Sequence, residues 1–593
     1  MKENNDDGLY LTDNKKAVIR YAGNEKKVVI PEGVEYICNL AFDLGWNNIE
    51  YNVDLSQIEE IILPKTLIGI GELGFSGCDF EKIDLPESLE SIEYGAFNGC
   101  DKLKSIFIPK NVYNIEDKVF EYCGSLESIN VDKDNPYFAS YKGILYNKDM
   151  TELIACPGGI LSVELPNTLK IINKFGFYCC TEIKKIVIPN SVTTIEGYAF
   201  DTCESLEEIK LPENLEEISE DLFSGCKKLK EIFIPKNTGW IDGDAFDGCE
   251  NLVSFEVDKE NPYSFSANGM IFNENNTLIK APTGIVSADI PDVCLKIGRD
   301  AFKDCEKLKS VKIPESVEKI DSNAFYYCKN LSSFVVDDNN PFFKSLDGAV
   351  YSRDLSELVI CPKNITSFNI PKTVKKIRGS AFTDCNKIRE ISIPKNVEEI
   401  EGNAFLDSGI KSIKISKNHP YLELHRGVLY NRDMTELKTC FKEVKTFRVP
   451  NTVKVINSGA FGNCSELRKL IISESVETIE DSAFASRLES ITVNKNNLYY
   501  KSRKGVLYNK DITELIMCPC RIFSLNIPKT VKKIGSDAFW YSNIFHIIVP
   551  KSVKIIEDGA FDCHTLSSIK LPKGFELDLS RTGLPKDCEI EYY

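Results

Sequence analysis

Residues 103–123 read LKSIFIPKNVYNIEDKVFEYC, and this stretch decides the fold because its pattern returns along almost the whole chain. Written generally, the pattern is L-x-x-I-x-I-P-x-x-V-x-x-I-x-x-x-A-F-x-x-C-x-x, a unit of 23 residues. The next unit begins at Leu126. A repeat of this length is typical of solenoid proteins, in which stacked units bury a core that one unit alone could not bury.

Proline is the simplest marker of the repeat. Most neighbouring marker prolines are 22 or 23 residues apart. The first gap, from Pro31 to Pro64, is 33 residues, and the gaps of 56, 57 and 78 residues correspond to one or two ordinary units plus a longer one. Sixteen prolines and six substitutes at the same position mark 22 coils. The six substitutes are Asp132, Asp258, Asp337, Ser416, Ser473 and Asn494.

The residue types predict the course of one coil. The L-x-x-I-x-I run ends in alternating apolar positions and indicates a β-strand, which the proline ends because it has no N–H group for the ladder. We expect the chain then to turn and to place the Val and Ile of the repeat pattern inward. It should close through a short helical or 3₁₀ turn at Ala-Phe. Strands of adjacent coils are expected to lie parallel.

Five units are longer because each carries the same insertion. Each insertion contains a line such as GILYNKDMTEL at residues 143–153, where two β-type runs flank a polar turn, so we predict a β-hairpin. Residues 9–31 match the second half of this unit and are expected to form a partial hairpin that caps the N-terminus. The insertions span residues 135–157, 261–282, 340–362, 419–440 and 497–519. A recurrent tyrosine is expected to pack each hairpin onto its coil; the copies are Tyr146, Tyr351, Tyr430 and Tyr508.

The phenylalanine of the unit recurs so regularly that we predict a continuous aromatic spine. The residue before it is usually alanine, which suits a place where coils meet closely. The spine residues are Phe42, Phe75, Phe97, Phe120, Phe177, Phe200, Phe223, Phe246, Phe302, Phe325, Phe382, Phe405, Phe461, Phe484, Phe539 and Phe561.

Many of the 21 cysteines lie three residues after a spine phenylalanine. The alternatives are a metal site, disulfides between coils, or a small buried side chain that packs. Other coils hold Ser408, Arg487 and Ser542 at this position, which a covalent or metal role would tolerate poorly. We therefore predict packing and no metal site. These cysteines, here called the cysteine ladder, are Cys78, Cys100, Cys123, Cys180, Cys203, Cys226, Cys249, Cys305, Cys328, Cys385 and Cys464.

Several functional classes have little support in the residues. A net charge of −17 disfavours a nucleic-acid partner, and no apolar run is long enough to indicate membrane insertion. The glycines at positions 69, 71 and 74 match a dinucleotide fingerprint, but they fall in register with the repeat. The histidines, His419, His425, His546 and His564, suggest no catalytic arrangement with their neighbours. We expect no enzyme activity, no catalytic residues, no cofactor and no bound metal.

The repeat and its recurring hairpin insertion resemble the BspA-type class of bacterial leucine-rich repeat proteins. This resemblance covers about residues 9–575 and implies a leucine-rich-repeat solenoid, with parallel β-strands on a concave face and short helical or 3₁₀ turns on the convex side. Members of the class are usually surface or secreted proteins implicated in adhesion and host-protein binding. The resemblance implies a location at the cell surface or outside the cell, although we recognise no signal peptide, sorting motif or anchor, and a cytoplasmic location is the alternative.

We expect three regions: an N-terminal cap over residues 1–30, the solenoid over residues 31–575 and a C-terminal cap over residues 576–593. The expected function is recognition of another protein, of unknown identity, by a monomer that uses its concave strands and hairpins. The alternatives are a structural scaffold or stalk and an intracellular protein-interaction module. Outward strand positions that hold apolar residues are the candidate binding face: Ile62, Phe107, Val187, Phe233 and Ile548.

Overall fold

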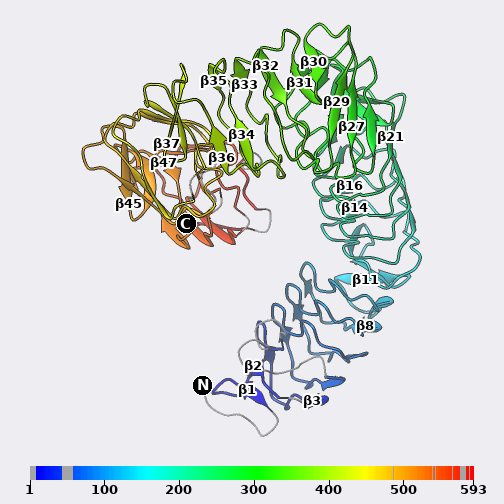
Figure 1. The fold of residues 1–593 in the computed structure, drawn as a ribbon. Helices are drawn as coiled ribbons and strands as arrows, with labels where there is room; N and C mark the ends of the chain where they lie inside the picture. The colour runs from blue at the N-terminus through cyan, green and yellow to red at the C-terminus, as the bar shows by residue number, and fades with distance from the viewer. Residues whose placement is uncertain are drawn as a thin grey trace. The chain divides into compact units, whose positions relative to one another are not determined.

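The computed structural model of the chain describes most of its 593 residues. The described residues are 8–23, 25–42, 58–441, 443–484, 487–536, 538–540, 542–563, 565–574, 582–585 and 588–593. They form two compact units, Met1–Leu308 with Lys319–Cys328, and Lys309–Glu318 with Lys329–Tyr593. Figure 1 shows that each unit is built of stacked coils. The expected caps lie partly outside the described residues, at 1–7, 24, 576–581 and 586–587, as does His564.

The L-x-x-I-x-I runs form the predicted strands, here called the first-row strands. In β8 the side chains alternate between exposed and buried, so Ile106 and Ile108 enter the core while Phe107 faces outward. Neighbours pair in parallel with equivalent residues opposite each other, as Phe107 and Asn130 are in β8 and β10. The first-row strands are β3 (Lys27–Val29), β5 (Glu60–Ile62), β8 (Ser105–Ile108), β10 (Ser128–Val131), β15 (Lys185–Val187), β17 (Glu208–Lys210), β19 (Glu231–Ile234), β21 (Ser254–Val257), β25 (Ser287–Asp289), β27 (Ser310–Ile313), β29 (Ser333–Val336), β34 (Glu390–Ser392), β36 (Ser412–Lys414), β40 (Thr446–Arg448), β42 (Lys469–Ile472), β44 (Ser490–Val493), β48 (Ser524–Asn526), β50 (His546–Ile548), β52 (Ser568–Leu571) and β53 (Glu589–Tyr592).

A second row of two-residue strands follows the marker position. These strands carry the inward isoleucine of the unit, and they also pair in parallel from coil to coil. Gly69 and Ile70 form one of them, so the glycine fingerprint begins on a strand of the repeat and continues into the turn that follows it. The second-row strands are β4 (Tyr36–Ile37), β6 (Gly69–Ile70), β7 (Ser91–Ile92), β9 (Asn114–Ile115), β14 (Ile171–Ile172), β16 (Thr194–Ile195), β18 (Glu217–Ile218), β20 (Trp240–Ile241), β26 (Lys296–Ile297), β28 (Lys319–Ile320), β33 (Lys376–Ile377), β35 (Glu399–Ile400), β41 (Val455–Ile456), β43 (Thr478–Ile479), β49 (Lys533–Ile534) and β51 (Ile555–Ile556).

The predicted hairpins are confirmed at all five insertions and at the partial unit near the N-terminus. In the first insertion β11, β12 and β13 pair in an antiparallel arrangement, and β13 also pairs in parallel with β14 of the second row. The hairpin therefore widens one coil without breaking the stack. The hairpin strands are β1 (Leu9–Leu11), β2 (Ala17–Tyr21), β11 (Phe138–Tyr141), β12 (Ile144–Asn147), β13 (Glu152–Ala155), β22 (Ser264–Ala267), β23 (Met270–Asn273), β24 (Thr277–Lys280), β30 (Phe343–Leu346), β31 (Ala349–Ser352), β32 (Glu357–Ile360), β37 (Leu422–His425), β38 (Val428–Asn431), β39 (Glu436–Cys440), β45 (Tyr500–Arg503), β46 (Val506–Asn509) and β47 (Glu514–Met517).

The turn around the spine phenylalanine is not helical, which corrects the expected helical or 3₁₀ turn. No helix occurs among the described residues. The N–H groups of Asn98 and Cys100 bond carbonyls three residues earlier, whereas those of Phe97 and Gly99 donate to carbonyls of the next coil. A helix would use nearly all of these N–H groups within itself. The alternation instead lets every second N–H group tie one coil to the next.

Left-handed residues produce this alternation. They recur two residues before and two residues after the spine phenylalanine, as at Lys118 and Tyr122 around Phe120, both with a φ of 57°. A positive φ is uncommon outside glycine, so its recurrence at fixed positions is a property of the coil. Each left-handed residue reverses the direction of the following peptide group and prevents a helix from continuing.

The aromatic spine is real but interrupted, so the prediction of a continuous spine is wrong. Rings stack within runs of ordinary coils, for example Phe177 on Phe200 with centroids 5.0 Å apart and Phe200 on Phe223 with centroids 5.6 Å apart. A hairpin unit supplies no phenylalanine at the spine position and has a chain segment such as Cys156-Pro157 there instead. The spine is therefore divided into short stacks by the insertions.

The ladder cysteines are buried free thiols, and this confirms the predicted packing role. Each thiol also donates a hydrogen bond to a main-chain carbonyl of the preceding coil. The Sγ of Cys203 lies 3.1 Å from the oxygen of Phe177, and the Sγ of Cys226 lies 3.2 Å from that of Phe200. Burial raises the pKa of both thiols well above its usual value, so they remain protonated donors.

Candidate binding surface

The five predicted binding residues all lie at the same outward position of first-row strands. Their exposed fractions lie between 39% and 52%. This exposure follows from strand geometry, because alternate side chains of a half-buried strand face opposite sides. Ile62, Phe107, Val187 and Phe233 belong to the first compact unit and Ile548 belongs to the second.

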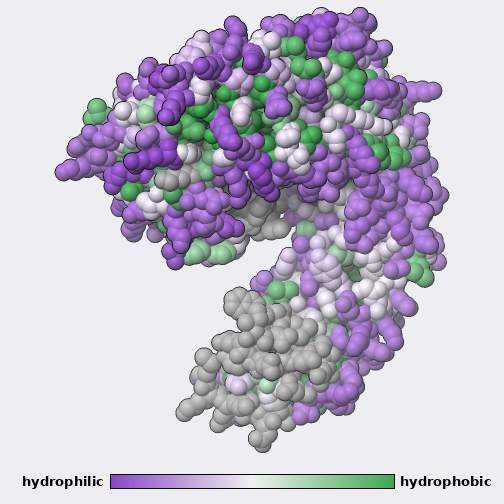
Figure 2. Space-filling model, in the orientation of Figure 1, coloured by the Kyte–Doolittle hydropathy of each residue, from purple (hydrophilic) through white to green (hydrophobic). Residues whose placement is uncertain are grey.

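The four residues of the first compact unit do not form one cluster, since none of their strands pairs with another of the four. Val187 lies opposite Lys210, and Ile548 lies between Asn526 and Lys570. Ile62 has an apolar neighbour, Val29, which occupies the equivalent position and which the sequence reasoning missed. On the face drawn in Figure 2, hydrophobic residues likewise form separate patches among hydrophilic ones.

Two missed positions could have been found from the repeat itself. Val29 and Val335 are both about half exposed and stand two residues before a marker position. Reading the same column in every coil would have identified them.

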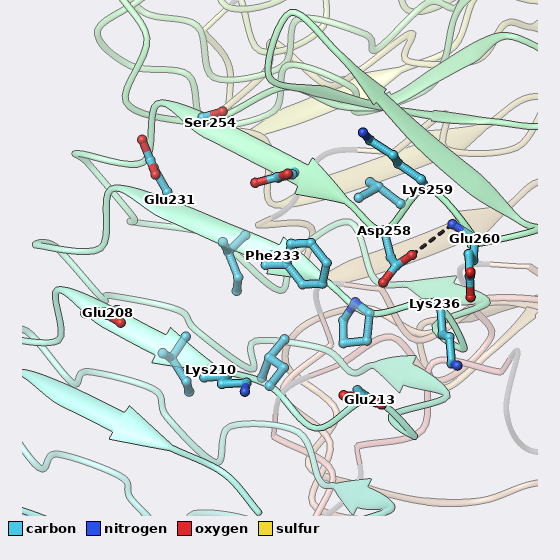
Figure 3. A pocket seen from close by; sticks show the side chains of 16 residues that line it. Glu208, Lys210, Glu213, Glu231, Phe233, Lys236, Ser254, Asp258, Lys259 and Glu260 are labelled. Carbon is cyan, nitrogen blue, oxygen red and sulfur yellow. Dashed lines mark hydrogen bonds between the residues drawn. The ribbon is translucent and has the colours of Figure 1, made fainter. Parts of the chain in front are cut away.

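One of the predicted residues lies in a groove. A groove of about 1090 Å³ extends over β17, β19 and β21, with Phe233 on the middle strand. Figure 3 shows the ring of Phe233 with Glu231 on the same strand and Lys210 on the preceding one. The side chains at its rim come from the segments that follow the three strands: Glu213, Lys236, Asp258, Lys259 and Glu260.

Two carboxylates of the groove lack the ion pairs that are common on first-row strands. Charges on these strands often pair with the next coil, as Lys27 does with Glu60 at 2.9 Å and Lys185 with Glu208 at 2.6 Å. Among the described residues, no ion pair engages the carboxylates of Glu231 and Glu256. Glu256 lies directly opposite Phe233 on the paired strand β21. An exposed ring therefore stands beside two carboxylates that have no ion pair.

The hairpin tyrosines are buried, as predicted, and are not available to a ligand. Burial raises the pKa of Tyr508 to about 12. The exposed aromatic residues of the hairpins lie elsewhere, directly after the opening Asn-Pro or its variant, and are 43% to 53% exposed. The sequence analysis did not assign these aromatic residues to the surface: they are Tyr137, Tyr263, Phe342, Tyr421 and Tyr499.

A buried or half-buried polar residue fixes the backbone at each of these exposed rings. The amide nitrogen of Asn135 donates to the carbonyls of Pro109 and Val112, while its oxygen accepts the N–H groups of Tyr137 and Phe138. His419 occupies this position in another hairpin unit. Its Nε2 contacts the oxygen of Pro394 at 2.9 Å, and its Nδ1 accepts from the N–H groups of Tyr421 and Leu422. This histidine thus has a structural role.

No cluster of His, Cys, Asp or Glu in the described part of the chain has an arrangement that could hold a metal ion. His546 contacts the hydroxyl of Ser568 at 2.7 Å on the strand surface.

A search of the described residues also found no helix with the length and hydropathy needed to cross a membrane. The surface offers rigid strands, exposed rings and charges, which are means of binding.

Comparison with known proteins agrees with the repeat. The family described as BspA type leucine rich repeat region matches in six copies, over residues 18–142, 156–278, 280–361, 356–440, 434–519 and 508–580. No curated protein matches the chain.

Solved leucine-rich repeat structures are also similar to the chain. A leucine rich cell surface protein from Faecalibacterium prausnitzii is 19% identical, with 80% of this chain and 92% of that one covered and a TM-score of 0.30. A leucine-rich repeat protein from Bacteroides ovatus is 22% identical, with 83% and 97% covered and a TM-score of 0.29. One from Eubacterium ventriosum is 20% identical, with 70% and 92% covered and a TM-score of 0.34.

Proposed function

Because the chain belongs to the BspA-type leucine-rich repeat family, we propose that it is a non-enzymatic recognition and adhesion protein that holds another protein against its first-row strands and hairpins. The observation that carries this proposal is the recurrence of exposed apolar side chains at one outward strand position. Apolar residues that stand among charges on a rigid surface are suited to act as anchors for a partner.

Solenoids commonly bind through the surface that their strands form, because the repeat makes that surface long and continuous. The hairpins add a second surface whose exposed rings are fixed by Asn135 and its equivalents. We propose that the protein acts at the cell surface or outside the cell as a monomer. A scaffold that self-associates and an intracellular interaction module are the alternatives.

Site-specific photo-crosslinking in the source cells tests this function. Benzoylphenylalanine replaces Phe107, Phe233 or Tyr137 in the full chain, and it replaces Leu161 as a control that is exposed in the bend after the first hairpin and does not occupy the outward strand position. The expected result is an adduct with one and the same class of partner protein from the strand positions and none from the control. Adducts only with a second copy of the chain would favour the scaffold, and adducts only from Leu161 would refute the proposal.

Protease shaving of intact cells tests the location. Peptides of this chain, released without cytosolic markers, are expected if the protein acts outside the cell. Their absence, with abundant protein in the lysate, would favour the intracellular module.

A further inference from the structure

We propose that the groove over β17, β19 and β21 holds an extended basic segment of the partner protein, with an arginine side chain laid over the ring of Phe233. This inference rests on the proposed function and names the chemistry of the partner at one place on the first-row strands. Three features of the groove support it: an exposed ring, carboxylates without an ion pair, and an excess of negative charge.

The ring of Phe233 provides the face for a cation. It is 45% exposed although it lies on the middle of the three strands, and Ile232 and Ile234 beside it are buried and hold the strand in place. A guanidinium group is planar and less strongly hydrated than an ammonium group, so it stacks on an aromatic face more readily.

The carboxylates beside this ring provide the charge. Glu231 precedes Phe233 by two residues and faces the same side of β19, and Glu256 lies opposite Phe233 on β21. Both side chains are exposed, and no ion pair engages either of them among the described residues. An arginine over the ring could bond one of them through two parallel N–H groups, which a lysine could not do.

The remaining charges favour a basic occupant and set its direction. Six carboxylates and three lysines line the groove, and the whole chain has a net charge of −17. Lys210 occupies the outward position of β17, one coil before Phe233. The partner's arginine therefore lies toward the β21 side of the ring, where Glu256 is, and away from Lys210.

Phe107 supplies a matched control within the same compact unit. It is exposed to a similar extent and occupies the same outward position, but it lies opposite Asn130 rather than a glutamate. Two acidic side chains of the preceding coil are paired, Glu81 with Lys104 at 2.8 Å and Asp84 with Lys82 at 2.7 Å. General adhesion to exposed rings would involve both phenylalanines, whereas the proposed site involves Phe233 alone.

The test uses the full chain and fluorescein-labelled peptides in which alanine alternates with arginine, lysine or glutamate. Fluorescence anisotropy at low ionic strength is expected to show binding of the arginine peptide, weaker binding of the lysine peptide and none of the glutamate peptide. Phe233→Ala should lower the affinity for the arginine peptide by about tenfold, and so should Glu231→Gln combined with Glu256→Gln. Phe107→Ala should change its affinity by less than about twofold.

Three outcomes would overturn the inference: no binding of the arginine peptide, equal binding of the lysine peptide, or equal weakening by Phe107→Ala and Phe233→Ala. Equal weakening would indicate attraction to the acidic chain as a whole. Circular dichroism of each variant confirms that the fold is retained. If the peptide fails while crosslinks to a partner persist, recognition stands and this inference falls. If the peptide binds at Phe233 but no partner is crosslinked in cells, the groove chemistry stands and the proposed function falls.

Discussion

The coils from Phe177 to Phe246 and those from Phe382 to Phe461 follow the same repeat but are held together differently. In the first region four rings stack without interruption, with successive centroids 5.0, 5.6 and 5.7 Å apart. In the second region Phe382 stacks on Phe405 at 5.3 Å, and the hairpin unit that follows breaks the stack. Phe405 instead meets Phe441 edge to face.

The ladder position differs at one coil of the second region. Cys203, Cys226 and Cys249 of the first region each donate to a carbonyl of the preceding coil. In the second region Cys385 and Cys464 also donate, but Ser408, which occupies this position between them, has a buried hydroxyl without a hydrogen-bond partner. Uninterrupted coils are thus held by stacked rings and thiol hydrogen bonds together, whereas coils beside a hairpin keep the thiol hydrogen bond and lose the stacked ring on that side.

The largest effect is expected when the uninterrupted stack is broken. Phe200→Ala removes a fully buried ring with stacked neighbours on both sides and should lower the local stability by about 3–5 kcal/mol. The half-buried Phe484 serves as the control, and Phe484→Ala should cost less. Hydrogen exchange of residues 177–246 measures the first change. Equal losses at the two positions would contradict the importance of the stack.

The hairpin-bearing coils should depend most on their buried asparagine. Asn497→Ala removes two bonds to the carbonyls of Ser473 and Val476 and two bonds from the N–H groups of Tyr499 and Tyr500. We expect a loss of about 2–4 kcal/mol, confined to the hairpin and its coil. Limited proteolysis and hydrogen exchange of residues 497–517 would detect it. His419→Asn is the control, since it should preserve the local structure; a similar loss there would refute this account.

The ladder offers a way to make the second region resemble the first. Ser408→Cys should place a thiol where it can donate to the carbonyl of Phe382, as the equivalent thiols do elsewhere in the ladder. We expect a gain of about 1 kcal/mol in the free energy of unfolding, measured by urea denaturation. The reverse change, Cys226→Ser, should cost a similar amount. A destabilised Ser408→Cys variant would show that packing, and not the hydrogen bond, selects the residue.

The smallest expected effect concerns pH. Burial raises the pKa of Asp221 to about 6, and the carboxylates of Asp244 and Asp247 add to this rise against a hydrogen bond with Tyr198. The folded state therefore holds this proton more tightly than the unfolded chain, where the pKa is near 3.8. The stability that the proton gives is present below about pH 4 and is lost as the pH rises to about 6.

Asp221→Asn should remove this part of the pH dependence. Because the group is only partly buried, the stability gained at neutral pH should stay below about 1 kcal/mol. Melting temperatures between pH 4 and pH 7, followed by circular dichroism, measure the slope, with the exposed Asp101→Asn as control. An unchanged slope in the Asp221→Asn variant would show that other carboxylates dominate it.

The sequence predicts the parts of the fold that depend on periodicity. Alternation at Ile106 and Ile108 indicates the first-row strand, and the polar turn after Tyr146 indicates the hairpin. The left-handed backbone could not be predicted, because lysine at 118 and tyrosine at 122 carry no sign of a positive φ. The interruption of the spine follows from the sequence, since the hairpin units lack the phenylalanine.

The candidate surface was predicted only in part. The outward position of Phe233 follows from strand alternation, so its exposure is confirmed. The sequence does not reveal the unpaired carboxylates beside this ring, because glutamates occur throughout the repeat. Only the structure distinguishes Glu208, which is paired, from Glu256. The role of all five residues in binding remains a prediction.

The alternating hydrogen bonds of the turns have a consequence for how such a chain can evolve. The turn of one coil donates N–H groups to the next coil, while its second-row strand donates to the coil before it, so each ordinary coil has two complementary edges. Duplication or deletion of a whole 22- or 23-residue unit rejoins matching edges and leaves the register intact. A duplication of any other length would misalign donors and acceptors in every later coil. Gene rearrangement can therefore change the length of the chain in whole coils, and hairpins can be gained or lost as parts of whole units.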